Sequence, residues 1–312
     1  MKTTDGNKIK VLFIAGWGRS GSTILDRILG QIEGFHSIGE FRYIWDRNMI
    51  EDRLCGCGVP FSKCGYWREV TKTAFNGENG VNPSRMVELR DNNLRSRHTI
   101  AMMSRRVKNR LVNQLQEYFD NLSILYSAIQ KISGCEFIVD SSKSPTHGWA
   151  LSQIQGIELY TVHLVRDPRA AAFSWSRPKM QPDTGKMAPM KRIGTIKSST
   201  LWTLWNLAIE KLKKNNPDKC ILLRYEDFAE NPRQSVDRIL KMTGTEKNRN
   251  PIIGERCVKL EIGHTASGNP DRFKTGEVEI KNDQRWRSQM KLSQKLIASL
   301  FSFPAARLYG YL

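Results

Sequence analysis

The hydrophobic and polar positions of the chain predict short strands, each followed by a helix. Apolar runs of strand length occupy residues 11–15, 137–139, 157–165 and 220–228. After each run the apolar residues recur at the spacing of an amphipathic helix. Strands that alternate with helices in this way favour a largely parallel sheet covered on both faces. The sequence therefore predicts an α/β fold, three-layer α/β/α, as a single domain over residues 1–312.

Other segments add to this alternation. Residues 83–132 carry apolar positions at helical spacing and predict a helical insertion. Residues 177–197 contain three prolines and two glycines, which predicts an irregular segment. This segment is interpreted as a lid over the site, a recognition loop or a solvated loop. Further helices are predicted over residues 199–213, 232–242 and 283–301.

A glycine-rich turn, GWGRSGST, joins the first predicted strand to the first helix. Its backbone N–H groups and the helix N-terminus suit an anionic group. Gly16 and Gly21 have the spacing of the nucleotide-phosphate pattern G-x-x-x-x-G-K-[ST], and Thr23 supplies its hydroxyl. Ser22, however, stands where that pattern has lysine, and Arg19 is the remaining cation. The turn is therefore predicted to be a phosphate-binding loop that lacks the lysine of ATP-binding loops.

Charged residues also follow two other predicted strands. Lys143 stands at the carboxyl end of the second strand, and Arg166 stands at that end of the third. In an open α/β sheet, this edge lines the crevice in which ligands bind. Asp167 and Pro168 mark the start of the next helix, and Ser174 lies two turns along it. These residues are candidates for one anion-binding crevice.

Composition and charge indicate what kinds of ligand and which cellular location to expect. The chain has 49 Lys and Arg against 31 Asp and Glu, a net charge of +18, which predicts attraction to anions. No apolar run approaches the ~20 residues needed to cross a bilayer. Residues 1–10 lack an apolar signal core, so we expect a cytoplasmic protein. Basic residues concentrate at 85–110 and 177–197, either as solvated faces or as surfaces for an acidic acceptor or anionic lipid.

Three of the six cysteines, Cys55, Cys57 and Cys64, stand close together in a C-x-C-x6-C run. Structural zinc sites usually have four ligands, with cysteines at C-x2–4-C spacing, and no fourth ligand is evident in this run. We therefore expect a compact, glycine-turned loop and no metal site. His36 is one of the nearest histidines and stands in an ordinary setting. His264 is interpreted as a structural histidine rather than as an acid or base.

These motifs resemble those of the sulfotransferases that use 3′-phosphoadenosine 5′-phosphosulfate (PAPS). Residues 19–23, Arg-Ser-Gly-Ser-Thr, resemble the 5′-phosphosulfate loop of that family. Arg166, followed eight residues later by Ser174, resembles its 3′-phosphate site, where a guanidinium fork and a hydroxyl hold a dianion. Lys143, in a strand that ends in Lys-x-Pro, matches the cation that stabilises the transferring sulfonate.

Other matches to the family are more local. The Gly-Glu pair that ends at Glu40 is similar to one whose glutamate acts as the base. The run Gly-Asn-Pro-x-Arg-Phe that contains Arg272 is similar to a late loop that closes over the 3′-phosphate. Tyr225, Glu226 and Asp227 resemble a segment that we interpret as bracing the fold.

The resemblance implies in-line transfer of a sulfonate from PAPS to a hydroxyl of a glycan, lipid or small-molecule acceptor, leaving adenosine 3′,5′-bisphosphate. It implies no metal and no nucleic-acid partner, while peripheral membrane contact stays open. The implied catalytic residues are Glu40, Lys143 and Arg19. The implied donor-binding residues are Gly18, Arg19, Ser20, Gly21, Ser22, Thr23, Arg166, Ser174 and Arg272.

Two alternatives stay open at this point. A P-loop phosphotransferase that uses ATP on a small molecule would keep the loop and Arg166, but it would have to work with Ser22 in place of lysine. A non-catalytic basic module that binds nucleic acid or a membrane would explain the net charge. The scattered distribution of that charge disfavours this second alternative.

Overall fold

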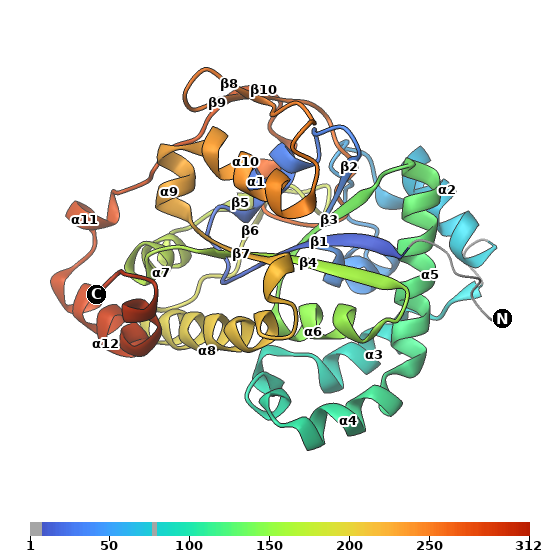
Figure 1. Ribbon diagram of the computed structural model, residues 1–312, viewed down its shortest axis with the longest axis horizontal. Helices are drawn as coiled ribbons and strands as arrows, with labels where there is room; N and C mark the ends of the chain where they lie inside the picture. The colour runs from blue at the N-terminus through green and yellow to red at the C-terminus, as the bar shows by residue number, and fades with distance from the viewer. Residues whose placement is uncertain (1–7, 77–79) are drawn as a thin grey trace.

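The protein, described by a computed structural model over residues 8–76 and 80–312, is built around a five-stranded sheet (Figure 1). The strand order is β2-β3-β1-β4-β7, and every neighbouring pair is parallel. The carboxyl ends of the five strands therefore meet at one edge. The edge strand β2 is not among the strands predicted from the sequence. The strands are β1 (Ile9–Ala15), β2 (Phe35–Gly39), β3 (Phe137–Lys143), β4 (Ile157–Val165) and β7 (Cys220–Arg224).

The central strand β1 separates two hydrophobic cores because its side chains alternate between the two faces of the sheet. Val11 and Phe13 pack in the core that includes α5, α6 and α8. Leu12 and Ile14 pack in the core that includes α1, α9 and α10. The predicted α/β/α layering is confirmed, and both helical layers are visible in Figure 1. The helices are α1 (Ser22–Leu29), α5 (Gln116–Ser133), α6 (Pro145–Gln153), α8 (Thr195–Lys213), α9 (Tyr225–Glu230) and α10 (Pro232–Thr243).

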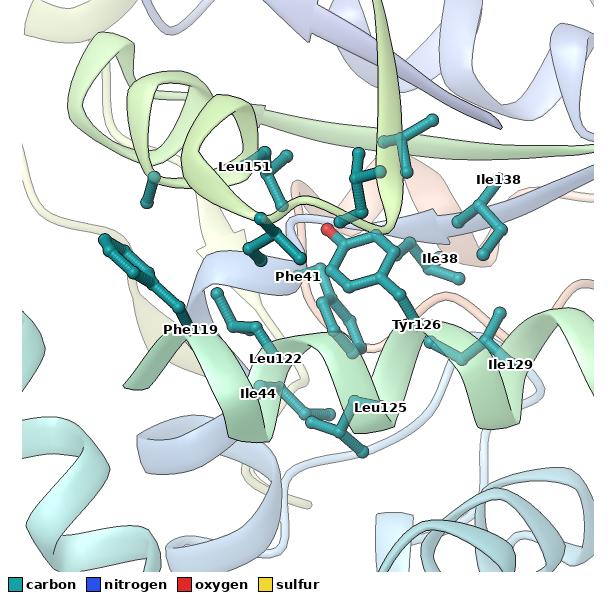
Figure 2. Close-up of a cluster of buried hydrophobic side chains, with 14 of the residues drawn as sticks. Ile38, Phe41, Ile44, Phe119, Leu122, Leu125, Tyr126, Ile129, Ile138 and Leu151 are labelled. Atoms are coloured by element: carbon teal, nitrogen blue, oxygen red, sulfur yellow. The ribbon is translucent and has the colours of Figure 1, made fainter. Parts of the chain in front are cut away.

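A helical region lies between β2 and β3, and its last helix packs against the sheet. Figure 2 shows the ring of Tyr126 of α5 directed toward Phe41 and Ile38, with Leu122 and Leu125 of the same helix in the same cluster. The helices predicted within 83–132 are present, and α2 precedes them. The additional helical elements are η1 (Phe41–Tyr43), η2 (Ile44–Ile50), η3 (Phe61–Lys63), α2 (Gly65–Phe75), α3 (Pro83–Asn93), η5 (Ser96–His98), η6 (Ala101–Met103) and α4 (Arg105–Gln114).

Several predicted bounds differ from the structure, among them the second strand, which extends to Lys143, and the helix predicted from 199, which begins at Thr195. The fourth strand ends at Arg224, because Tyr225 already begins α9. The helix expected over 283–301 is divided into α11 and α12, because the backbone is extended at Met290 and Lys291. The segment 177–197, predicted to be irregular, contains a small hairpin of β5 and β6.

The helices and strands not yet named complete the described chain. They are β5 (Met180–Gln181), β6 (Ala188–Pro189), α7 (Pro168–Ser176), η7 (Pro217–Lys219), β8 (Ile252–Ile253), β9 (Cys257–Leu260), η8 (Pro270–Phe273), β10 (Gly276–Glu279), α11 (Trp286–Gln289) and α12 (Leu292–Leu308).

A segment from the C-terminal part of the chain lies along the outer edge of β2. The N–H of Ala266 donates to the carbonyl of Ile38 at 2.9 Å, and the N–H of Glu40 donates to the carbonyl of Ser267 at 2.9 Å. A parallel bridge between Gly39 and Ser267 completes the pairing. This contact joins the end of β2 to a loop more than 200 residues later. Across the described ranges, no helix is both long and apolar enough to span a bilayer.

The packing of α5 can be tested with two neighbouring residues. Leu125 is fully buried, whereas the side chain of Ile124 is 43% exposed. Leu125→Ala should lower the free energy of unfolding by about 2–5 kcal/mol, since it removes buried contacts and leaves a cavity. Ile124→Ala should change it by only about 0.5 kcal/mol. Urea unfolding measures both, and equal losses would contradict the packing of α5.

Candidate functional site

The predicted phosphate-binding loop lies at the carboxyl end of β1, where the chain turns into α1. Gly16 has φ 144°, and a Cβ there would lie 2.2 Å from the carbonyl oxygen of Leu164. Gly21 has φ 84°, and a Cβ there would lie 2.4 Å from the ring of Tyr225. Helix α1 begins at Ser22 with no acidic residue in its first turn. The N–H groups of that turn therefore lie at a helix end suited to an anion.

Arg19 lies in the loop with a left-handed backbone conformation, and its guanidinium packs against an aromatic ring. Its φ of 70° is left-handed, and its guanidinium lies 4.8 Å from the centre of the Trp175 ring. Burial lowers the pKa of Arg19, and the charges of Glu40 and Asp271 oppose this effect. Within the described chain its buried Nε has no hydrogen-bond acceptor. An unpaired buried donor is costly, so the oxygen of an anionic ligand would fit here.

The two residues of the predicted 3′-phosphate site, Arg166 and Ser174, differ in their burial and in their hydrogen-bond partners. Arg166 is buried, and it donates from Nη1 to the carbonyl of Arg19 at 2.9 Å and from Nη2 to the carbonyl of Asp283 at 3.1 Å. Its guanidinium also lies over the ring of Tyr225. The Ser174 side chain is half-buried, and no partner for its hydroxyl is found in residues 8–76 and 80–312. Arg166 thus braces the loop, while Ser174 is the hydroxyl available to a ligand.

Lys143 and Glu40 meet beside the loop because β2 and β3 are neighbouring strands. Lys143 ends β3 opposite Ala15 of β1, and its carbonyl accepts a 3.2 Å hydrogen bond from the N–H of Gly16. Its φ of 66° is left-handed, as at a sharp turn. The Nζ of Lys143 lies 2.7 Å from Oε1 of Glu40, and both side chains are largely buried. The structure thus brings together a cation and a carboxylate that the sequence places 103 positions apart.

The charge state of Glu40 depends on nearby cations. Burial alone would raise the pKa of Glu40, because it penalises the charged form. The positive charges of Lys143, Arg47 and Arg272 outweigh burial, so the pKa lies below its usual value. The carboxyl group is therefore ionised, which is the form that can accept a proton.

Asp140 is a buried carboxylate that the sequence analysis did not single out. It accepts hydrogen bonds from the hydroxyl of Tyr126 at 2.6 Å and from the N–H of Ser142 at 2.8 Å. Its Oδ2 also lies 2.9 Å from Nε2 of His147. Burial raises the pKa of Asp140, but these partners lower it by more than burial raises it. The pKa of Asp140 is therefore below its usual value. This network fixes the turn that carries Lys143.

Asp26 is a second buried carboxyl group, on the sheet-facing side of α1. Its Oδ2 accepts a 2.6 Å hydrogen bond from the hydroxyl of Ser37. Burial raises the pKa of Asp26 to about 7. The sequence does contain a signal, because Asp26 stands at helical spacing among Ser22, Leu25 and Leu29, where an apolar side chain is expected.

Arg272 joins three loops. Its Nη1 donates to the carbonyl of Thr265 at 2.8 Å, and its Nη2 donates to the carbonyl of Leu54 at 2.6 Å. It also pairs with Asp183 at 3.4 Å, and both side chains are almost fully buried. In this arrangement the η groups of Arg272 bind the protein's own loops.

The segment 177–197 is attached to the same region. The Nζ of Lys179 donates to Oδ1 of Asn269 and to Oδ2 of Asp271, both at 2.6 Å. The Sδ of Met190 lies 3.6 Å from Nη2 of Arg19. The segment therefore contacts both the phosphate-binding loop and the loop that precedes Arg272.

Part of the basic stretch 85–110 is internal. Arg90 is buried and donates to both carboxylate oxygens of Asp46, at 2.9 and 3.0 Å, and to the carbonyl of Arg42. Arg90 therefore links α3 to η2 and is not a surface charge. A small cavity of about 30 Å³ lies nearby and contains none of the predicted site residues. It is lined by Thr99, Met102, Lys108, Pro145, Thr146, Trp149, Ala208, Lys211 and Leu212.

The three clustered cysteines lie together with a histidine that the sequence analysis interpreted separately. The ligand atoms of Cys55, Cys57, Cys64 and His264 all lie within 4.8 Å of one another. His264 is therefore a neighbour of the thiols, and it comes 200 residues after Cys64.

Comparisons with known proteins identify a family and a fold. The sequence model of the Sulfotransferase family matches residues 12–249. The structure is similar to the sulfotransferase domain of the olefin synthase of Synechococcus PCC 7002, with a TM-score of 0.53 and 18% identity over 97% of this chain and 98% of that chain. It is also similar to the sulfotransferase domain from the curacin biosynthetic pathway, with a TM-score of 0.49 and 15% identity over 95% and 99% of the two chains. A search of curated protein sequences gives no significant match.

The raised pKa of Asp26 predicts a pH dependence of stability. The folded protein binds this proton up to about pH 7, whereas the unfolded chain loses it near pH 3.9. The stabilisation is therefore complete below about pH 4 and is lost as the pH rises through about 7. Asp26→Asn, which carries no charge, should flatten this dependence and be the more stable protein at about pH 8. Urea unfolding across this range tests it, and parallel curves for the two proteins would contradict the raised pKa.

Proposed function

Because the chain belongs to the sulfotransferase family, we propose that it transfers the sulfonate group of PAPS to a hydroxyl of an acceptor. The observation that carries this proposal is the buried ion pair of Lys143 and Glu40 beside the loop. It offers one cation for an anionic donor and one carboxylate for the acceptor's proton. The alternative, an ATP-dependent phosphotransferase, is less well supported because Ser22 replaces the lysine of that loop.

We assign the 5′-phosphosulfate group to the N-terminus of α1. The backbone N–H groups of Gly18, Arg19, Ser20 and Gly21 and the hydroxyls of Ser22 and Thr23 would hold its oxygens. The free Nε of Arg19 adds a charged donor.

For the 3′-phosphate we propose Ser174 and Arg166. The hydroxyl of Ser174 is available, and the Nε of Arg166 is buried without a partner in the described chain. Arg272 also has a buried Nε without a partner in the described chain, but its charge is compensated by Asp183 and its η groups donate to the carbonyls of Thr265 and Leu54. No ion pair of Arg166 is found among the described residues, so its charge is the one left for a phosphate. We therefore assign Arg272 to holding the surrounding loops in place, a positioning role.

Transfer breaks the bond from sulfur to the leaving phosphate oxygen as the bond to the acceptor oxygen forms, in line. Lys143 and Arg19 neutralise charge on the leaving oxygen, and Glu40 takes the acceptor's proton. While Lys143 is paired only with Glu40, the pKa of Glu40 is low and the carboxylate is a weak base. When Lys143 shares its charge with the donor, burial of Glu40 is less fully offset and its pKa rises. Glu40 therefore becomes a stronger base in the loaded site.

The acceptor is proposed to be a hydroxyl compound with acidic or amphipathic character. The segment 177–197 carries six basic residues and one acidic residue, and it contacts the loop through Met190 and Arg19. The stretch 85–110 contributes less, because Arg90 is used internally. A small phenol or alcohol is the alternative acceptor.

The donor can be tested with its product, adenosine 3′,5′-bisphosphate. At about 100 times its Kd it should stabilise the protein by about 2.7 kcal/mol, and ADP with Mg²⁺ should not. Ser174→Ala should weaken bisphosphate binding about tenfold or more, since a hydrogen bond to a charged group is lost. Ser176→Ala is the control, because that hydroxyl donates to the carbonyl of Phe173 in the same helix. Thermal melting and titration calorimetry measure both effects; stabilisation only by ADP with Mg²⁺ would support the phosphotransferase.

The base can be tested with Glu40→Gln. The amide keeps the size of the side chain but cannot accept the proton, so turnover should fall by a factor of about 100 or more. Bisphosphate affinity should be kept or increased, because Lys143 no longer has a carboxylate partner in this variant. Radiolabelled PAPS offered with phenol, alcohol and glycan acceptors measures transfer, and Glu33→Gln at an exposed position is the control. Full turnover by Glu40→Gln would mean that another group takes the proton.

A further inference from the structure

A second cluster of chemically active side chains lies beside the site that the sulfotransferase reaction uses. Cys55 and Cys64 are buried, whereas Cys57 and His264 are half-buried. All three cysteines are free thiols. We propose that these four residues bind one structural Zn²⁺ ion.

Three of the six distances between the ligand atoms are close to those of tetrahedral zinc, and the other three are at most 4.8 Å. The Sγ atoms of Cys57 and Cys64 are 3.7 Å apart. The Nδ1 of His264 lies 3.3 Å from Sγ of Cys64 and 3.8 Å from Sγ of Cys55. Ligands at about 2.3 Å for sulfur and about 2.0 Å for nitrogen around a tetrahedral ion are separated by ~3.8 Å and ~3.5 Å respectively. The side chains are therefore already spaced as ligands of one ion.

The ligand types also select the metal and its role. Three thiolates and one imidazole match a Cys3His structural zinc site, which leaves no open position for water or substrate. The half-buried side, formed by Cys57 and His264, provides an entry path for the ion. The ring of Tyr66 stacks on His264 at 5.1 Å with an interplanar angle of 20°, which holds the imidazole in orientation.

The fourth ligand explains why the cysteine spacing alone does not indicate zinc. In the run from Cys55 to Cys64 only three ligands are present, and no histidine stands at a zinc-finger spacing. Folding supplies the imidazole from a segment 200 residues further along the chain. The site is thus made by tertiary structure rather than by a local motif.

Zinc at this position would link the loop of residues 55–64 to the segment that begins at His264, and both lie beside the catalytic site. The N–H of Gly56 donates to the carbonyl of Thr265 at 2.9 Å, so the cysteine loop already lies against the segment that begins at His264. That segment continues to Ser267, whose carbonyl accepts the N–H of Glu40. The ion therefore acts on the position of the proposed base, while the thiols take no part in sulfonate transfer.

The metal content of the full chain tests the proposal directly. Protein purified without a metal-affinity tag from zinc-supplemented cells should hold about one zinc per chain by elemental mass spectrometry. Replacing zinc with Co²⁺ should give the absorption spectrum of tetrahedral thiolate ligation. Cys57→Ser and His264→Ala should retain about tenfold less zinc after dialysis. Cys220→Ser is the matched control, because Cys220 is a half-buried free thiol outside the cluster.

A strong chelator should lower the Tm of the wild type, and Zn²⁺ but not Mg²⁺ should restore it. Wild-type protein that holds no zinc and takes up none when reduced would overturn the proposal, whether or not the variants fold. A disulfide between Cys57 and Cys64 in the native protein would also overturn it and identify a redox pair. Equal zinc in Cys57→Ser and Cys220→Ser would place the ion elsewhere. None of these readouts depends on PAPS, so failure here and failure of the proposed reaction are distinguishable.

Discussion

Buried charge must be compensated, and this constraint determines how the site is built. Lys143 and Glu40 lose most of their hydration at the sheet edge, so each requires the other. The same holds for Asp140, which is surrounded by hydrogen-bond donors, and for Arg272, which is paired with Asp183. Removing one partner would leave an uncompensated charge, which costs more than the pair contributes. Few other arrangements of these side chains would satisfy their charges.

The parallel sheet is what allows so many charges to meet. All five strands end at one edge, and the loop after β1 lies between the ends of β3 and β4. Helix α1 adds its positive N-terminus at the same place. Stability and chemistry consequently use the same groups: Lys143 stabilises a buried carboxylate, and it is also the cation proposed to assist transfer. A substitution at such a position affects both properties.

Much of this was predictable because the decisive signals were local. The strands β1, β3 and β4 are apolar runs, and Arg19, Lys143 and Arg166 stand at fixed offsets from their ends. Strand β2 was missed because its half-buried His36 and Ser37 interrupt the apolar pattern at the sheet edge. The contact of Arg272 with Leu54 spans 218 positions, and that of His264 with Cys64 spans 200. No local pattern encodes such contacts, since they exist only once the loops have packed.

The loop paired with β2 also bears on how the molecule behaves in a crowded solution. An edge strand with free N–H and carbonyl groups is a template onto which another chain can add. The segment at Ala266 and Ser267 occupies part of that template by bonding to Ile38 and Glu40. Detaching this segment would disturb catalysis and would also expose the unpaired N–H and carbonyl groups at the edge of β2. Molecules damaged at this point would be prone to intermolecular β-pairing and aggregation.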